Sequence, residues 1–223
     1  MKRKLQNSRN TANVVRIDPL APDKDEIRKA AQILKQKGVL VFPTSGLYGL
    51  AADAFSIEAV GRVFTIKRRP ADMPVLVMLS GSQDMKRVVR TVPDFAAPLV
   101  GLWPGGITLV FEAGDAVPEV LTGGTGKIGV RMPAHPVARA LVRQFGGPIT
   151  ATSANLSGCL AASDAADLDP RICTEVDLVI DGGILAGGVG STVLDVSRWP
   201  VTIIREGAVS RQSIDNVLAK RTA

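Results

Sequence analysis

The chain has 223 residues, of which 46% are hydrophobic and 22% charged, so it is long enough for one sizeable core and is neither fibrous nor disordered as a whole. Its net charge of +6 comes from its ends, where residues 1–10 carry four basic side chains and Lys220 and Arg221 add two, while the 21 basic and 21 acidic residues between them balance. The two cysteines and the single histidine lack metal-type spacing, which argues against a disulfide framework and a protein-held metal. No apolar run reaches the about 18 residues that a membrane span needs. We therefore expect a cytoplasmic protein.

The first half of the chain predicts a tail followed by alternating helices and strands. Residues 1–12 are polar and are expected to form a disordered basic tail, with a single domain over residues 13–223. Apolar spacing, capping residues and β-branched runs predict a helix over 25–37 ending at Gly38, a buried strand over 39–42, a helix over 57–67 capped by Ser56, a strand over 74–80 and a short helix over 82–90.

The second half is richer in strands. The same patterns predict strands over 108–113 and 127–133 joined by a glycine-rich, hairpin-like link, a helix over 135–145, a strand over 148–155, strands over 176–183, 191–197 and 201–207, and a final helix over 210–221. Strands neither alternate strictly with helices nor cluster at one end. The sequence therefore predicts a mixed α/β fold, with a twisted mixed sheet flanked by helices.

Four predicted strands end in small polar residues, glycine or one charge: "VFPTSGLYG", "ITATSANLSG", "GVGSTVLD" and "IIREG". Any one of these ends could be an ordinary turn or cap. Four in one domain favour a ligand site, because ligands commonly bind where strands end and glycine allows close approach. Tyr48, in the first of them, fits either a ligand contact or simple packing.

A basic cluster, "TIKRRP", ends the helix over 57–67. Lys67, Arg68 and Arg69 would complement the helix dipole, but they would equally form a clamp for phosphate groups. The chain has no P-loop, no dinucleotide-binding glycine motif and no G-x-S-x-G element. If it is an enzyme, we expect it to act by neutralising charge and positioning substrates rather than by covalent catalysis.

The motifs "PTSGLYGL", "IKRRPADMP", "WPGGITLVF", "IGVRMPAHPVA", "TSANLSG", "GSTVLD" and "IIREG" occur in the order seen in the YrdC-like family, which the chain resembles from about residue 25 to 210. Members of this family include L-threonylcarbamoyl-AMP synthases. The resemblance implies a concave basic cavity and a reaction that joins L-threonine, bicarbonate and ATP into threonylcarbamoyl-adenylate and pyrophosphate. A partner transferase would then modify an adenosine of tRNA.

The resemblance also implies roles for individual residues. Those expected at ATP are Lys67 and Arg69, which would face the phosphates as catalytic residues, together with Ser153, Asn155, Arg205 and Lys127. Those expected at threonine are Thr44, Ser191 and Arg131, with Arg131 pairing the carboxylate. Mg²⁺ is expected with the nucleotide, since no carboxylate cage for it is evident.

The chain departs from the family pattern at four positions. Ser45 stands at an acidic position, Gly46 at a threonine, Met73 at an asparagine and Met78 at a histidine. We expect these changes on the side of the cavity that holds threonine or orients the nucleotide. Three interpretations follow: a synthase with an altered amino-acid pocket, a diverged nucleotide-binding paralogue, or a non-enzymatic module that binds tRNA or double-stranded RNA.

Overall fold

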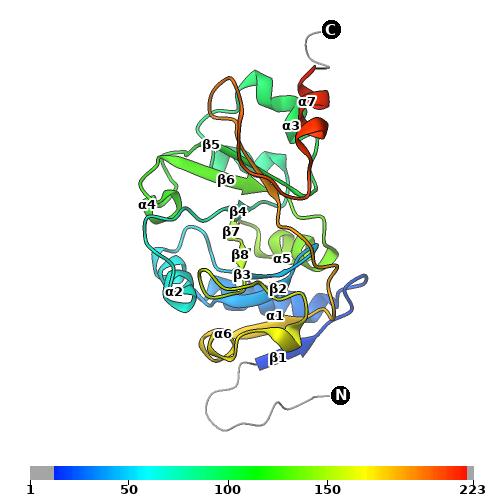
Figure 1. Cartoon of the computed structure of the whole chain (residues 1–223). Helices are drawn as coiled ribbons and strands as arrows, with labels where there is room; N and C mark the ends of the chain where they lie inside the picture. The colour runs from blue at the N-terminus through cyan, green and yellow to red at the C-terminus, as the bar shows by residue number, and fades with distance from the viewer. Residues whose placement is uncertain (1–12, 220–223) are drawn as a thin grey trace.

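The computed structural model describes residues 13–219, so the predicted basic tail over 1–12 lies outside it (Figure 1). The described strands form two mixed sheets. One has the order β1 (Asn13–Arg16), β9 (Leu178–Asp181), β2 (Leu40–Pro43), β3 (Tyr48–Ala51), β8 (Thr152–Ser153). The other has the order β11 (Thr202–Arg205), β10 (Thr192–Asp195), β5 (Ile107–Glu112), β6 (Lys127–Arg131), β4 (Val77–Met78), β7 (Ile149–Thr150).

The predicted mixed α/β fold is confirmed, although the strands divide between two sheets instead of joining one. The division falls within the predicted strand over 148–155, which splits into β7 in the upper sheet of Figure 1 and β8 in the lower sheet. The two sheets meet there, because the amide of Thr150 donates to the carbonyl of Ala52 at 2.8 Å and Asp53 bridges to Ile149. A single short segment thus links both halves of the protein.

Two helices pack together on one face of the lower sheet. The helix α1 (Lys24–Lys35) begins at Asp23, whose carboxylate accepts from the amides of Asp25 and Glu26, and it buries the apolar residues that recur along one face. The helix α5 (Pro136–Phe145) packs against α1 in the same hydrophobic cluster, which also holds Leu40 and Phe42 from β2. Both helices were predicted from their spacing.

The helix α2 (Ile57–Lys67) has the predicted bounds. Its cap is Ser56, whose hydroxyl accepts from the amide of Ala59 at 3.2 Å. It ends at Arg68, which adopts a left-handed conformation with φ 50° and turns the chain sharply. This turn lies between Lys67, the last residue of α2, and Arg69.

Several short elements differ from the prediction. Residues 82–90 contain a 3₁₀ helix over Ser82–Arg87, and the glycine-rich link contains the helical turn α4 (Glu119–Thr122). The strands β1 and β3 were not predicted. The remaining described helices are α3 (Ala97–Val100), α6 (Pro170–Glu175), α7 (Arg211–Ala219) and the 3₁₀ turns Asp94–Ala96 and Ala165–Asp167.

The polar cluster after β2 is a hairpin turn. β2 and β3 pair antiparallel, with Pro43 opposite Tyr48, so residues 44–47 form the turn between them. Tyr48 is fully buried, and its hydroxyl donates to the carbonyl of Gly183 at 2.7 Å and accepts from the amide of Gly182 at 3.1 Å. Of the two roles left open for Tyr48, the structure supports packing.

The contact between α1 and α5 should carry much of the stability of the lower half. Leu34 is fully buried there. Leu34→Ala should therefore lower the free energy of unfolding by about 2–5 kcal/mol through lost burial and a cavity. The exposed Arg28→Ala should cost less than about 1 kcal/mol. Urea denaturation of both variants measures this, and equal effects would contradict the packing described.

Candidate functional site

Lys67 lies at the centre of a polar group at the end of α2. The residue is 2% exposed, and its ammonium donates to the backbone carbonyls of Ser153, at 2.5 Å, and Asn155, at 2.6 Å. It also donates to the side-chain oxygen of Asn155 at 3.3 Å. In return, the amide of Ser157 donates to the carbonyl of Lys67 at 2.8 Å. The structure thus brings together three of the residues that the family resemblance implies at ATP.

The surroundings of the Lys67 ammonium raise the free energy of its charged form. Burial, together with the nearby positive charge of Arg69, lowers the pKa of Lys67 to about 8. The three oxygens that accept from the ammonium favour its charged form. No carboxylate among residues 13–219 forms an ion pair with Lys67. An incoming anion would supply the missing negative charge.

The side chains of Ser153 and Asn155 hold each other in fixed positions. The hydroxyl of Ser153 donates to the side-chain oxygen of Asn155, the same atom that faces Lys67. The amide group of Asn155 donates to the carbonyls of Leu156, at 2.9 Å, and Cys159, at 2.7 Å. This arrangement fixes which end of the amide points to the lysine. The end of β8 is therefore held in place by hydrogen bonds within the protein.

Arg69 lies just beyond the end of the helix. Its guanidinium donates from Nε to the carbonyl of Met73 at 3.2 Å and from Nη2 to the carbonyl of Pro74 at 2.7 Å. Burial lowers the pKa of Arg69, although an arginine remains charged at physiological pH. Met73 is one of the four positions where the chain departs from the family pattern, and its backbone carbonyl therefore helps to hold this cation.

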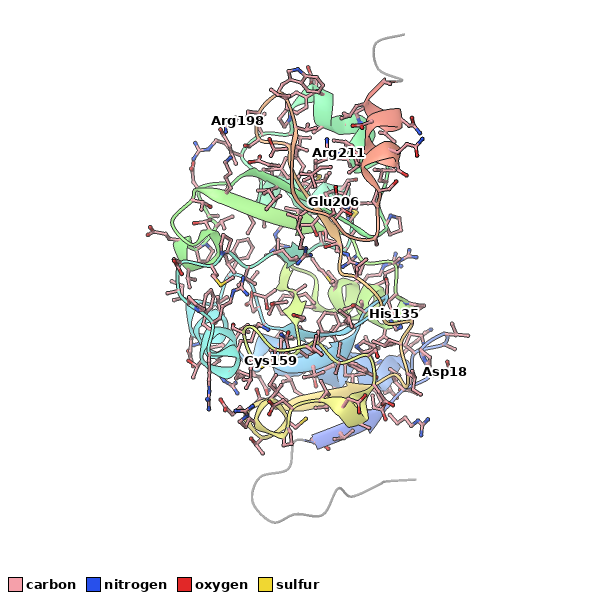
Figure 2. All side chains as sticks on the ribbon, in the orientation of Figure 1. Asp18, His135, Cys159, Arg198, Glu206 and Arg211 are labelled. Atoms are coloured by element: carbon pink, nitrogen blue, oxygen red, sulfur yellow. The ribbon has the colours of Figure 1, made fainter. Side chains whose placement is uncertain are left out.

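A second cationic group lies in the upper sheet. Ser191, directly before β10, is buried, and its hydroxyl shares a hydrogen bond of 2.7 Å with the hydroxyl of Thr108. Arg205 donates to the carbonyl of Ser191 at 2.8 Å, and Arg131 donates to the carbonyl of Gly105 at 3.1 Å. In Figure 2, Glu206, the neighbour of Arg205, lies in the upper half of the protein, and Cys159, which accepts a hydrogen bond from Asn155, lies in the lower half. The two cationic groups therefore belong to different halves.

The two arginines of this group share an anion-attracting environment. Burial, followed by the positive charge of Arg205, lowers the pKa of Arg131. Within residues 13–219, neither arginine forms an ion pair with a carboxylate. Two guanidinium groups without a counter-charge favour binding of a carboxylate or phosphate.

Thr44 and Lys127 have partners within the protein. The hydroxyl of Thr44 donates to the carbonyl of Leu47 at 2.6 Å, across the hairpin turn. Lys127 and Arg131 lie at the two ends of β6. Lys127 forms an ion pair of 2.7 Å with Asp195. The structure does not bring Lys127 together with either cationic group.

Met78 occupies a different environment from the one expected. It was predicted on the ligand side, but its side chain is 2% exposed and belongs to the hydrophobic cluster under α1 and α5. The strand β4 places it there, because Val77, its neighbour along the strand, belongs to the other large cluster. Met78 is therefore a core residue, and this part of the prediction is wrong.

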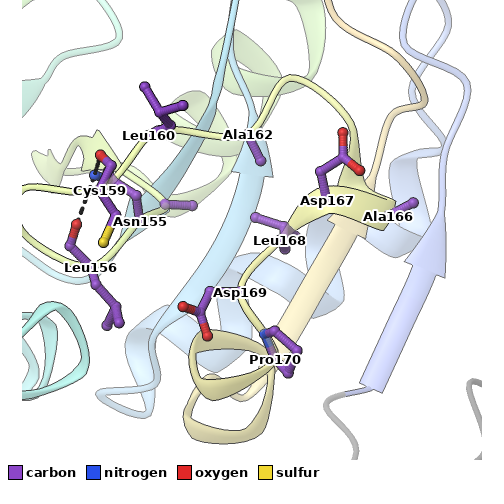
Figure 3. Close-up of a pocket in the computed structure, with 11 residues that line it drawn as sticks. Asn155, Leu156, Cys159, Leu160, Ala162, Ala166, Asp167, Leu168, Asp169 and Pro170 are labelled. Atoms are coloured by element: carbon purple, nitrogen blue, oxygen red, sulfur yellow. Dashed lines mark hydrogen bonds between the residues drawn. The ribbon is translucent and has the colours of Figure 1, made fainter.

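A cavity of about 360 Å³ adjoins the Lys67 group (Figure 3). Asn155 lines one side, and the opposite side is formed by residues 166–170. Sequence reasoning missed this second wall, although Asp169 before Pro170 is a recognisable helix start and caps α6. Asp169 also pairs with Arg171 at 2.7 Å.

The described residues offer no evident site for a protein-held metal or a membrane span. Within residues 13–219, no three His, Cys, Asp or Glu side chains are grouped so as to hold a metal ion. In the same part of the chain, no helix is both long enough and apolar enough to cross a bilayer.

Comparison with known proteins identifies the family. Residues 32–207 match the Sua5/YciO/YrdC family, described as "Telomere recombination". The threonylcarbamoyl-AMP synthase of Pyrococcus abyssi is 36% identical over 196 residues, covering 87% of this chain and 58% of that protein. The one from Bacillus subtilis is 36% identical over 207 residues, covering 90% and 59%. The crystal structure of P. abyssi Sua5 complexed with L-threonine matches with a TM-score of 0.88 and 34% identity, covering 92% of this chain and 60% of that one.

The fold and the two cationic groups define a mixed α/β protein with anion-attracting strand ends. The chain belongs to the Sua5/YciO/YrdC family. It spans about three fifths of the length of these relatives.

The titration of Lys67 should be visible in ATP binding. Only the ammonium form attracts phosphate, and this form is lost as the pH rises through about 8. Affinity for ATP should therefore fall about 30-fold between pH 7 and pH 9.5. Lys67→Met should bind ATP weakly and with little dependence on pH over this range. Calorimetric titration measures both, and identical pH profiles for the two proteins would contradict the assignment.

Proposed function

We propose that the chain is an L-threonylcarbamoyl-AMP synthase. It would convert L-threonine, bicarbonate and ATP into L-threonylcarbamoyl-adenylate, pyrophosphate and water. The observation that carries this proposal is the buried ammonium of Lys67 at the helix end next to Ser153 and Asn155. Oxygen atoms accept its hydrogen bonds, but no carboxylate within residues 13–219 pairs with it. The relatives from P. abyssi and B. subtilis, both named threonylcarbamoyl-AMP synthase, support it.

The proposed reaction brings anions together, which is why it needs cations. The amine of threonine and bicarbonate form a carbamate with loss of water. A carbamate oxygen then attacks the α-phosphorus of ATP, and the bond to the bridging oxygen of pyrophosphate breaks. Lys67 and Arg69 would offset the charge that accumulates on the phosphates, and Ser153 and Asn155 would hold the nucleotide. Arg205 would face the nucleotide from the upper sheet.

The amino acid would bind near the second cationic group. Arg131 would pair with the carboxylate of threonine, because it is partly buried and has no acidic partner within residues 13–219. Ser191 and Thr44 offer hydroxyl groups for the polar atoms of threonine. The L-threonine complex of P. abyssi Sua5, whose fold matches this chain, supports an amino-acid site of this kind.

The remaining partners follow from the same proposal. Mg²⁺ would arrive bound to the phosphates of ATP, because residues 13–219 contain no metal cluster of their own. The adenylate is an activated acyl donor, so a transferase that acts on a tRNA adenosine would consume it in the cytoplasm. Lys127, which the resemblance implies at ATP, pairs with Asp195, so a role at ATP would require it to leave that carboxylate.

Threonine-dependent release of pyrophosphate tests the proposal. The purified protein should release pyrophosphate from ATP and bicarbonate only when L-threonine is present. Lys67→Met should lower kcat by about 100-fold or more, the typical cost of losing one donor that stabilises developing charge. Lys86→Met, at an exposed lysine of the 3₁₀ helix Ser82–Arg87, is the matched control and should leave kcat unchanged.

Other outcomes point to the alternatives. ATP binding without threonine-dependent turnover would contradict the proposal and indicate a diverged paralogue. Salt-sensitive binding of tRNA or double-stranded RNA without any turnover would indicate an RNA-binding module instead.

A further inference from the structure

A glycine-rich segment links the two sheets. Residues 182–190, here called the strap, follow β9 in one sheet and lead to β10 in the other, and five of the nine are glycine. In Figure 1 this segment lies between yellow and orange on the colour scale and leads from the lower half to the upper half. It therefore connects the part of the protein that carries the hairpin turn over 44–47 with the part that carries Ser191.

Hydrogen bonds hold the strap along its length. At its start, the hydroxyl of Tyr48 bonds to Gly182 and Gly183. Further along, the amide of Leu185 donates to the carbonyl of Ser163 at 2.8 Å, and the amide of Gly187 donates to the carbonyl of Gly46 at 3.0 Å. The strap is a fixed part of the fold.

The strap requires a glycine at position 46. A Cβ atom on Gly46 would lie 2.4 Å from the backbone carbonyl oxygen of Gly187, far closer than real contacts allow. Gly46 is not among the residues with positive φ, so its own backbone would accept any L-amino acid. The approach of the strap alone therefore excludes a side chain here.

The far end of the strap is packed equally closely. The amide of Ala208 donates to the carbonyl of Gly190 at 3.0 Å, and a Cβ on Gly207 would lie 2.3 Å from that same carbonyl oxygen. Ser191 follows directly and accepts from Arg205. One end of the strap thus rests on the hairpin turn and the other supports the second cationic group.

We propose that Gly46 is a specificity-determining, positioning residue for the amino-acid substrate. By admitting the carbonyl of Gly187, it seats the strap on the hairpin turn and fixes the distance between Thr44 and Ser191. These two hydroxyl groups would then fit a small L-amino acid with a polar side chain. The inference rests on the proposed function, because it presupposes that an amino acid binds between the two residues.

Gly46→Ala tests the inference through the two substrates separately. The added methyl must displace the strap, so KM for L-threonine should rise at least about tenfold, in line with the loss of one hydrogen-bonding contact. KM for ATP should rise by a clearly smaller factor, because Arg205 lies beside the strap at Gly190 but the Lys67 group is held by Ser153 and Asn155. Hydrogen exchange at the amides of Leu185 and Gly187 should become faster.

Gly61→Ala is the matched control. Gly61 lies within α2, and a Cβ there would meet nothing within 4 Å. This variant should keep both KM values and the exchange rates of the strap. A thermal melt and the ATP affinity of each variant establish that it is folded.

A second variant, Leu185→Ala, changes a residue of the strap itself. Leu185 is 9% exposed and packs in the hydrophobic cluster beneath the strap, so Leu185→Ala should loosen the strap without touching the hairpin turn. It should give the same rise in KM for threonine, and it remains informative if Gly46→Ala does not fold.

Distinct outcomes would overturn the two proposals. Faster exchange in the strap with an unchanged KM for threonine would overturn the inference and leave the synthase assignment intact. An equal rise of both KM values would also overturn it, because that pattern indicates general loosening. If the wild-type protein shows no threonine-dependent release of pyrophosphate, the proposed function fails, and the role of Gly46 in selecting an amino acid fails with it.

Discussion

The organisation of the site depends on one buried ammonium. Lys67 enters the interior at the end of α2 and is solvated by three oxygens of Ser153 and Asn155 instead of by water. Removing a charge from water without an opposite charge is costly, and within residues 13–219 the compensation comes from carbonyl dipoles and not from a carboxylate. The same interactions tie α2 to the end of β8, so that the architecture and the anion-binding chemistry depend on the same atoms.

The two halves of the protein contribute different cations to the candidate site. Lys67 and Arg69 follow a helix beside the lower sheet, whereas Arg131 and Arg205 come from strands of the upper sheet. Ser153 and Thr150 are only three residues apart yet belong to different sheets, so the two sheets meet close to the Lys67 group. The hairpin turn over 44–47 and the strap over 182–190 provide a second connection. A substrate with several anionic groups would bind to both halves at once.

Helices and strands could be predicted from the sequence where nearby residues mark both of their ends. α2 could be predicted to the residue, because Ser56 is a strong cap and "KRRP" ends the helix. β3 could not, since Tyr48–Ala51 is buried on both faces, contains Gly49 and pairs with β8 about 100 residues away. The partner of Lys127 is equally remote in sequence, 68 residues away at Asp195. The polar groups around Lys67 were recognisable only as a set, through the order of motifs that the family shares.

Hydrogen exchange with and without ATP tests the role of Lys67 most directly. The amides of Asn155 and Cys159 donate to carbonyls of the segment that Lys67 holds, and the amide of Ser157 donates to the carbonyl of Lys67 itself. If the phosphates of ATP draw the ammonium away from its carbonyl ligands, exchange at these three amides should change on binding, while the amides of α1 remain as they were. Saturating ATP that leaves all three amides unaffected would show that the nucleotide binds elsewhere and would contradict the role given to Lys67.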